Sequence, residues 1–292
     1  MSDIRDSVNS MTELLTARSF LFAPGSDDRK LRRALASPAD AVIADLEDAV
    51  TPAMKTAARQ LVADVFSEGR ESTGRRLVRV NAVGTEWHED DLAMVAGLGV
   101  DGVVLPKATA QAAAAVAAVL AIPIIAIVET AEGLRGAYEI AASSSVVGLV
   151  LGAVDLGVAL GLEPRPDGQE LLYARSSVVV DSAAAGLRGP IDQVWLDVRD
   201  PTGLAGDCAL ARSLGFRGKA CIHPDQVEIV NVAFSPSDRE LDRARDVVAA
   251  FEQAEREGLG VIALDGEMID LPVVERARLL IADNERRVLD AD

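Results

Sequence analysis

The segment that decides the fold is Ile122–Gly161, which reads IPIIAIVETAEGLRGAYEIAASSSVVGLVLGAVDLGVALG. It contains two short aliphatic runs, Pro123–Val128 and Val146–Val154, with a helix-like stretch, Ala131–Ala142, between them. Runs this short and this apolar are typical of strands that are covered on both faces, as in a parallel sheet. The segment therefore predicts a strand–helix–strand unit whose two strands are parallel.

A carboxylate follows each of the two runs: Glu129 after the first and Asp155 after the second. If the strands are neighbours, both side chains emerge at the same end of the sheet, where two bare carboxylates repel and raise each other's pKa. A divalent cation removes that cost, and two carboxylates with waters and a substrate oxygen are typical of a Mg²⁺ site. The alternative is that both are strand-end residues that face solvent or cap a helix.

The same alternation of strand and helix runs through most of the chain. We count eight strand–helix units between about Ser19 and Phe234, and eight such units predict a closed (β/α)₈ TIM barrel. An open doubly wound sheet is the alternative, but no glycine-rich dinucleotide fingerprint follows the first strand. The expected strands are Ser19–Pro24, Ala41–Ala44, Leu77–Val80, Gly102–Leu105, Pro123–Val128, Val146–Val154, Gln193–Leu196 and Gly218–Ile222.

Two further helices are expected after the barrel, Asp238–Gly258 and Pro272–Val288, with a short strand-like piece between them. We therefore predict a barrel domain over residues 15–235 and a C-terminal helical extension over residues 236–292. An extension this small cannot bury a large core alone, so we expect it to pack as a lid on the barrel or on a neighbouring subunit.

Composition limits the possible partners and location. The 292 residues carry a formal net charge of −17, which argues against nucleic acid or an anionic membrane surface as the main partner. Two cysteines are too few for a disulfide framework, which favours a cytoplasmic protein. No stretch has transmembrane character. The N-terminus, MSDIRDSVNSMTELL, is polar, so we expect a loose arm and no secretory signal.

Polar residues follow the aliphatic runs around the whole predicted barrel, and the carboxyl ends of barrel strands are where active sites form. Arg79 and Lys107 among these carboxylates suit an anionic, oxygen-rich substrate such as a 2-oxo acid, which the fork of Arg79 would clamp. Glu47 is expected near the cation, through a water, or as a helix cap. The strand-end residues are Pro24, Asp45, Glu47, Arg79, Asn81, Lys107, Glu129, Asp155, Asp197 and His223.

Each of these residues also has a structural interpretation. Arg79 could be an interior residue that pairs with Asp45 or Glu47, and Lys107 could extend into solvent. His223 could be a structural histidine. The only other histidine, His88, falls in what looks like an exposed helix start, so a histidine metal site or a Ser/His/Asp triad is poorly supported.

Several segments of the chain together resemble a known family. They are RSFLFAPGSDDRKLRRALASPADAVIADLEDAV, LVRVN, DGVVLPKA, IIAIVET, LVLGAVDLGVALG, GFRGKACIHPDQVEIVNVAFSPS and LDGEMIDLPVVERAR. In order and in content they resemble the citrate lyase β-subunit-like proteins, which belong with malyl-CoA and citramalyl-CoA lyases in the HpcH/HpaI aldolase group. The resemblance covers nearly the whole chain from Arg18 onward.

This resemblance implies a TIM barrel, Mg²⁺, a homotrimer or hexamer, and reversible cleavage of a 3-hydroxy-carboxyacyl-CoA thioester into an acyl-CoA and a 2-oxo acid. It implies that Glu129 and Asp155 bind the metal and that Arg79 holds the substrate carboxylate. It places the catalytic aspartate at Asp270, in GEMIDLP, although Asp270 could instead cap the final helix. Glu47 joins the expected catalytic residues, and Glu129, Lys107 and Arg18 join the expected substrate-binding residues.

Other outcomes stay open within the same family. The chain could be a metal-dependent aldolase of free hydroxy-oxo acids, a malyl-CoA thioesterase, or a non-catalytic assembly subunit.

Overall fold

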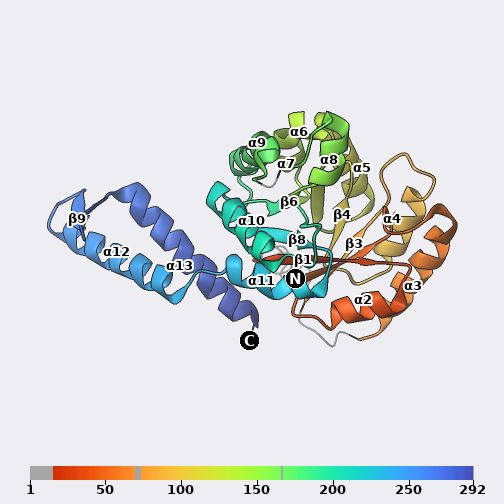
Figure 1. Cartoon of the computed structure of the whole chain (residues 1–292), viewed down its shortest axis with the longest axis horizontal. Helices are drawn as coiled ribbons and strands as arrows, with labels where there is room; N and C mark the ends of the chain where they lie inside the picture. The colour runs from red at the N-terminus through yellow and green to blue at the C-terminus, as the bar shows by residue number, and fades with distance from the viewer. Residues whose placement is uncertain (1–15, 70–73, 166, 292) are drawn as a thin grey trace. The chain divides into compact units, whose positions relative to one another are not determined.

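A computed structural model describes residues 16–69, 74–165 and 167–291, so the expected N-terminal arm lies outside the described residues. The chain divides into two compact units, residues 1–234 and residues 235–292. Figure 1 shows both, and each is described below by itself.

The first unit is a closed barrel of parallel strands in the order β1-β2-β3-β4-β5-β6-β7-β8, which confirms the predicted TIM barrel. The barrel closes where Ser19 of the first strand pairs with Lys219 of the last. The strands are β1 Ser19–Pro24, β2 Ala41–Asp45, β3 Arg75–Arg79, β4 Gly102–Leu105, β5 Ile124–Val128, β6 Val146–Leu151, β7 Ile191–Asp192 and β8 Gly218–Cys221.

Helices follow the strands and surround the barrel (Figure 1). Several begin at a residue whose side chain accepts a hydrogen bond from the first turn, among them Thr109, Thr130 and Asp200. The helices of this unit are α2 Asp28–Leu35, η1 Pro52–Met54, α3 Lys55–Ser67, α4 His88–Ala96, α5 Ala110–Val119, α6 Ala131–Arg135, α7 Ala137–Ala141, α8 Ala153–Leu160, η2 Gln169–Leu171, α9 Leu172–Ala184, α10 Pro201–Leu214, η3 Pro224–Gln226 and α11 Val227–Ala233.

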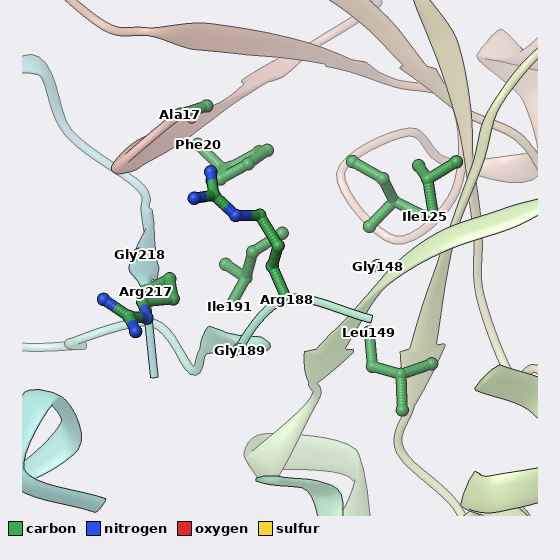
Figure 2. Close-up of a pocket in the computed structure, with 11 residues that line it drawn as sticks. Ala17, Phe20, Ile125, Gly148, Leu149, Arg188, Gly189, Ile191, Arg217 and Gly218 are labelled. Carbon is green, nitrogen blue, oxygen red and sulfur yellow. The ribbon is translucent and has the colours of Figure 1, made fainter. Parts of the chain in front are cut away.

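The barrel interior is a packed core. Alternate strand residues, including Phe20, Ile43, Leu77 and Val104, form one buried cluster, and the intervening residues form a larger cluster with the helices. A cavity of about 20 Å³ remains beside Phe20, where Figure 2 shows the Arg188 side chain extending past it. That space is enough for about one water molecule, as in the packed interior of a barrel whose active site lies at the carboxyl ends of its strands.

Two predicted strands end earlier than expected. The run Val146–Val154 was predicted as one strand, but β6 stops at Leu151 and the chain turns at Gly152 into α8, so Asp155 lies in the first turn of a helix. The predicted strand Gln193–Leu196 is wrong, because β7 covers only Ile191–Asp192. In that segment the Trp195 carbonyl accepts a hydrogen bond from the Gln226 side chain, 2.8 Å away, and not from a neighbouring strand.

The second unit is a helical hairpin with a small β-hairpin at its turn. Helix α12 (Asp238–Arg256) begins with a capping box between Ser237 and Glu240. Strands β9 (Ile262–Leu264) and β10 (Glu267–Ile269) are antiparallel, and helix α13 (Leu271–Ala291) follows. The turn Asp265-Gly266 has φ values of 52° and 85°, as a tight β-hairpin requires.

In the described ranges, no helix has both the length and the apolar character needed to cross a membrane.

Candidate active site

The carboxyl ends of strands β2 to β5, which we call the barrel mouth, bring together five of the predicted strand-end residues, Asp45, Glu47, Arg79, Lys107 and Glu129. Arg79 ends β3 and donates from Nε and Nη2 to the two oxygens of Asp45, at 2.7 and 2.6 Å. Its Nη1 lies 3.0 Å from Oε2 of Glu47 and 3.3 Å from Oδ2 of Asp48. The guanidinium also lies over the ring of Phe22, 5.1 Å from its centroid.

Arg79 is therefore paired as the structural interpretation expected, with Asp45 and Glu47 as partners. Asp45 occupies the side of its fork made by Nε and Nη2, and Nη1 lies against Glu47 and donates to the half-exposed Asp48, so a ligand carboxylate would meet Nη1 in place of Asp48. Burial lowers the pKa of Arg79, but its hydrogen bonds to Asp45 and the charges of Glu47 and Asp48 outweigh that effect and raise the pKa above the usual range. The guanidinium is thus a fixed cation in a set orientation.

Lys107 joins two carboxylates from different strands. Its Nζ donates to Oε1 of Glu47 at 2.5 Å, and its backbone N–H donates to Oε1 of Glu129 at 2.7 Å. The backbone of Lys107 has a φ of 46°, which is unusual for a residue with a side chain. Backbone strain of this kind persists only where surrounding contacts hold it, and it is common at functional sites.

Glu129, after β5, is the most perturbed acid at the barrel mouth. It is 3% exposed, and burial raises its pKa to about 7. The Lys107 N–H opposes this shift, whereas the charges of Glu47 and Asp155 add to it. Because Asp155 contributes, the two predicted metal ligands lie within electrostatic range of each other, on the adjacent strand–helix units that the sequence indicated.

Gly152, between β6 and α8, lets Glu129 and the first turn of α8 approach each other. A Cβ atom at Gly152 would lie 2.5 Å from Cβ and 2.7 Å from Oε2 of Glu129, closer than side chains can pack. Any larger residue would displace the carboxylate. The glycine is therefore part of the site, and Asp155 follows it by three residues.

The donor set fits a divalent cation that keeps part of its hydration. The described residues contain no cluster of three or more His, Cys, Asp or Glu side chains suited to a metal, so Glu129 and Asp155 would share the ion with water and ligand oxygens. A cation would relieve both the burial and the repulsion that raise the pKa of Glu129. Oε2 of Glu47 is buried and has Nη1 of Arg79 3.0 Å away as an ion pair but accepts no hydrogen bond, and a water on the ion could supply one.

Three predicted residues lie away from this group. Arg18 precedes β1 at the opposite end of the barrel, where its Nε and Nη2 each donate to the Asp40 carboxylate at 2.8 Å, so its assignment to the substrate site is wrong. Asp197 is exposed and accepts from the backbone N–H of Arg199. His223 is structural, since its Nδ1 accepts from the backbone N–H of Asp225 at the start of η3.

Asp270 belongs to the C-terminal unit. Its Oδ1 accepts a hydrogen bond from the N–H of Val273 at 3.4 Å, at the start of α13, so the capping interaction that we considered is present. A cap of this kind leaves the second carboxylate oxygen available.

One local prediction for the segments around the site is wrong. His88 is 6% exposed, and its Nδ1 lies 2.7 Å from the Asn81 carbonyl, so it does not belong to an exposed helix start. The sequence did not indicate that Lys55 is buried close to these residues, where its side chain donates a hydrogen bond to Asn81.

A second concave feature lies beside the helix that carries Asp155. It is a pocket of about 860 Å³ between α8 and the segment that follows β7. Its lining is mostly apolar, with Val158, Trp195 and Leu196 among the lining residues, and it includes Asp197. Its volume is in the range of small-molecule sites.

Known proteins are similar to this chain in sequence and in fold. The family profile described as HpcH/HpaI aldolase/citrate lyase matches residues 18–224. Citrate lyase subunit beta of Escherichia coli K12 is 38% identical over 284 residues, which cover 92% of this chain and 94% of that protein. A (3S)-malyl-CoA thioesterase of Cereibacter sphaeroides KD131 is 39% identical over 270 residues, with 92% and 94% covered.

A solved structure of a third protein is also similar to this chain. CitE from Mycobacterium tuberculosis, in complex with magnesium, acetoacetate and coenzyme A, superposes with a TM-score of 0.80 at 36% identity, over 92% of this chain and 98% of that one. Sequence, barrel and relatives agree over nearly the full length of the chain. It belongs to the HpcH/HpaI aldolase/citrate lyase family.

Proposed function

We propose that this protein is a magnesium-dependent carbon–carbon lyase. It would cleave, reversibly, a 3-hydroxy-carboxyacyl-CoA thioester such as malyl-, citramalyl- or citryl-CoA into acetyl-CoA or another acyl-CoA and a 2-oxo acid. The observation that carries the proposal is the buried Glu129, which lies within range of Asp155 and is held by Lys107, beside the fixed cation of Arg79. The magnesium, acetoacetate and coenzyme A in the M. tuberculosis relative support it.

In this proposal Glu129 and Asp155 hold Mg²⁺. When bound, the ion supplies a Lewis acid for the oxygen that becomes the carbonyl of the 2-oxo acid. Arg79 would bind the carboxylate of that acid through Nη1, in exchange for its contact with Asp48, and Asp45 keeps the guanidinium oriented before the substrate arrives. The Lys107 ammonium adds positive charge close to the same position.

Cleavage moves the electrons of the breaking C–C bond onto the α-carbon of the thioester, which takes up a proton, while the hydroxyl loses one as it becomes the carbonyl. We assign Asp270 as the donor of the first proton and Glu47, through a water near the cation, as the acceptor of the second. Burial raises the pKa of Glu47, and the charge of Arg79 and the hydrogen bond from Lys107 oppose that shift. In the reverse direction Asp270 would remove a proton from the thioester.

Asp270 lies in the C-terminal unit, so we propose that this unit serves as a lid over the barrel mouth of a neighbouring subunit in a homotrimer or hexamer. A lid would exclude water from the reacting fragments. The α12–α13 hairpin supports this assignment, because its own buried core is small, with Val247, Phe251, Ile269 and Val274 among its members.

The second candidate is a thioesterase, favoured by the (3S)-malyl-CoA thioesterase relative at 39% identity. It would release free coenzyme A and leave the hydroxy acid intact. The bonds broken differ, so the products separate the two activities.

The test is a panel of hydroxyacyl-CoA thioesters incubated with the protein and Mg²⁺, with products identified by mass spectrometry. We expect a 2-oxo acid and a shortened acyl-CoA, both lost in the double variant Glu129→Gln, Asp155→Asn. The variant Asp64→Asn, which removes an exposed carboxylate of α3 outside the barrel mouth and the second pocket, is the matched control and should stay active. Free coenzyme A with an intact hydroxy acid would replace the lyase with the thioesterase, and cleavage of a free hydroxy-oxo acid alone would indicate the free-acid aldolase.

A further inference from the structure

Lys55 is a buried lysine that packs against the segment carrying Glu47. It is the first residue of α3 and is 5% exposed. Its Nζ donates to the main-chain carbonyls of Leu46 and Glu47, at 2.7 Å each, and to Oδ1 of Asn81 at 2.6 Å. The Trp87 ring covers the ammonium, with its centroid 5.1 Å away. An ammonium has three N–H donors, so all of them are used.

These three bonds hold the backbone that follows β2. Strand β2 ends at Asp45, and although the Leu46 N–H still donates to the Arg79 carbonyl of β3, the carbonyls of residues 46 and 47 accept from Lys55. With both carbonyls held, the Cα–Cβ direction of Glu47 is set. The carboxylate at the other end of that side chain then reaches Lys107 and Arg79.

Asn81 ties the same stretch to the next strand. Its Nδ2 donates to the Leu46 carbonyl at 3.1 Å and to Oδ2 of Asp91 at 2.6 Å, and its N–H also donates to Asp91. Burial lowers the pKa of Lys55, and the charges of Asp45, Glu47 and Asp91 oppose that shift. The lysine is thus surrounded by acceptors and acids, which offset the cost of burying its charge.

We propose that Lys55 is a positioning residue for Glu47: through the carbonyls of residues 46 and 47 it holds the Glu47 carboxylate between Arg79 and Lys107. The catalytic side of this inference rests on the proposed function, whereas the positioning itself does not.

A double-mutant cycle tests the catalytic side. We expect Lys55→Met to lower kcat for thioester cleavage by roughly 10- to 100-fold, the range of an activity loss from a lost supporting contact, with KM changed less than threefold. In the Glu47→Gln background the same change should have less than a twofold further effect, because the carboxylate that Lys55 positions is already gone. An equal loss in both backgrounds would show that Lys55 only supports the fold and would overturn the proposal. Lys30→Met, at an exposed lysine of α2, is the matched control.

Hydrogen exchange tests the positioning without any assay of activity. Amides of residues 46–50 should exchange at least tenfold faster in Lys55→Met, while those of β4 and β5 stay protected. Lys55→Arg keeps the charge but not the three-donor geometry, and should also speed exchange; it replaces Lys55→Met if that variant does not fold. Unchanged exchange at residues 46–50 would overturn the proposal. If the wild type cleaves no thioester, the proposed function fails, and the exchange rates still decide the role of Lys55.

Discussion

Magnesium affinity should depend on pH because protons compete for Glu129. The pKa of this group is about 7 in the metal-free protein, against an ordinary 4.5. Below pH 7 each pH unit should weaken Mg²⁺ binding by about tenfold, so affinity should be roughly 30-fold lower at pH 5.5 than on the plateau above pH 8, or about 2 kcal/mol. A glutamate with the ordinary pKa would give about a 1.1-fold change over the same interval.

Calorimetric titration with Mg²⁺ at pH 5.5, 6.5, 7.5 and 8.5 measures this dependence. Repeating the titration at pH 6.5 in buffers of different ionisation enthalpy counts the protons released, and we expect about three quarters of a proton per ion. In Glu129→Gln the proton release should disappear together with most of the affinity. An affinity that stays flat from pH 5.5 to 8.5 would refute the buried, protonated Glu129.

The same group should affect folding stability. Because the folded pKa of Glu129 is raised above its ordinary 4.5, the folded protein binds more protons than the unfolded chain between pH 4.5 and about 7. The Glu129 contribution to the free energy of unfolding should therefore fall as pH rises through that window, by about 3 kcal/mol without metal. Urea denaturation of wild type and Glu129→Gln, compared at pH 5 and pH 8 in EDTA, measures it. A wild-type difference equal to that of the variant would contradict the assignment.

Three further predictions concern the other groups of the site. Arg79→Lys keeps the charge but loses the fork that Asp45 orients, so 2-oxo acid binding should weaken by roughly 1.5–3 kcal/mol, and an unchanged Kd by calorimetry would count against the clamp. Lys107→Val should bind Mg²⁺ several-fold more weakly than Lys107→Gly, because a β-branched residue resists the positive φ that aims the N–H at Glu129; equal affinities would remove the role of the strained backbone. Asp270→Asn should lose turnover and keep Mg²⁺ binding, and mixing it with inactive Glu129→Gln subunits should restore part of the activity; no recovery despite subunit exchange would exclude a lid that acts in trans.

The barrel could be predicted from the sequence because its strands are short aliphatic runs that lie between helices. The errors occur where hydrophobicity does not distinguish strand from helix. Val146–Val154 is apolar throughout, so hydrophobicity could not locate the turn at Gly152. A glycine is necessary at that position because Glu129 approaches it closely. In β7 the ladder ends early because the Trp195 carbonyl is bound by Gln226, a contact between residues 31 positions apart.

The sequence predicted which charged residues lie at the site, but it predicted only some of the contacts between them. Strand ends brought Glu47, Arg79, Lys107 and Glu129 together as expected, since parallel strands place their carboxyl ends at one mouth. No local pattern reveals that Lys107 has a positive φ, because lysine is not a residue that favours it. The burial of Lys55 could not be predicted from its local sequence either, because its partner Asn81 is 26 positions away.

Arg18 shows the limit of reasoning from position along the chain. It stands next to β1, but at the amino end of that strand, where Asp40 precedes β2 and binds it. The direction of the strand, and not its proximity in sequence, excludes Arg18 from the mouth. Asp270 is a different case, because it lies in the C-terminal unit, to which the direction of the barrel strands does not apply.

The central claim is that Glu129 and Asp155 hold the magnesium to which a 2-oxo acid binds. Calorimetric titration of pyruvate, glyoxylate or oxaloacetate into the protein, with Mg²⁺ and again in EDTA, tests it most directly. We predict saturable binding of at least one of these acids with Mg²⁺, none in EDTA, and none in the Glu129→Gln, Asp155→Asn double variant, which should remain folded by circular dichroism. Binding of equal affinity in EDTA, or full binding by the double variant, would contradict it.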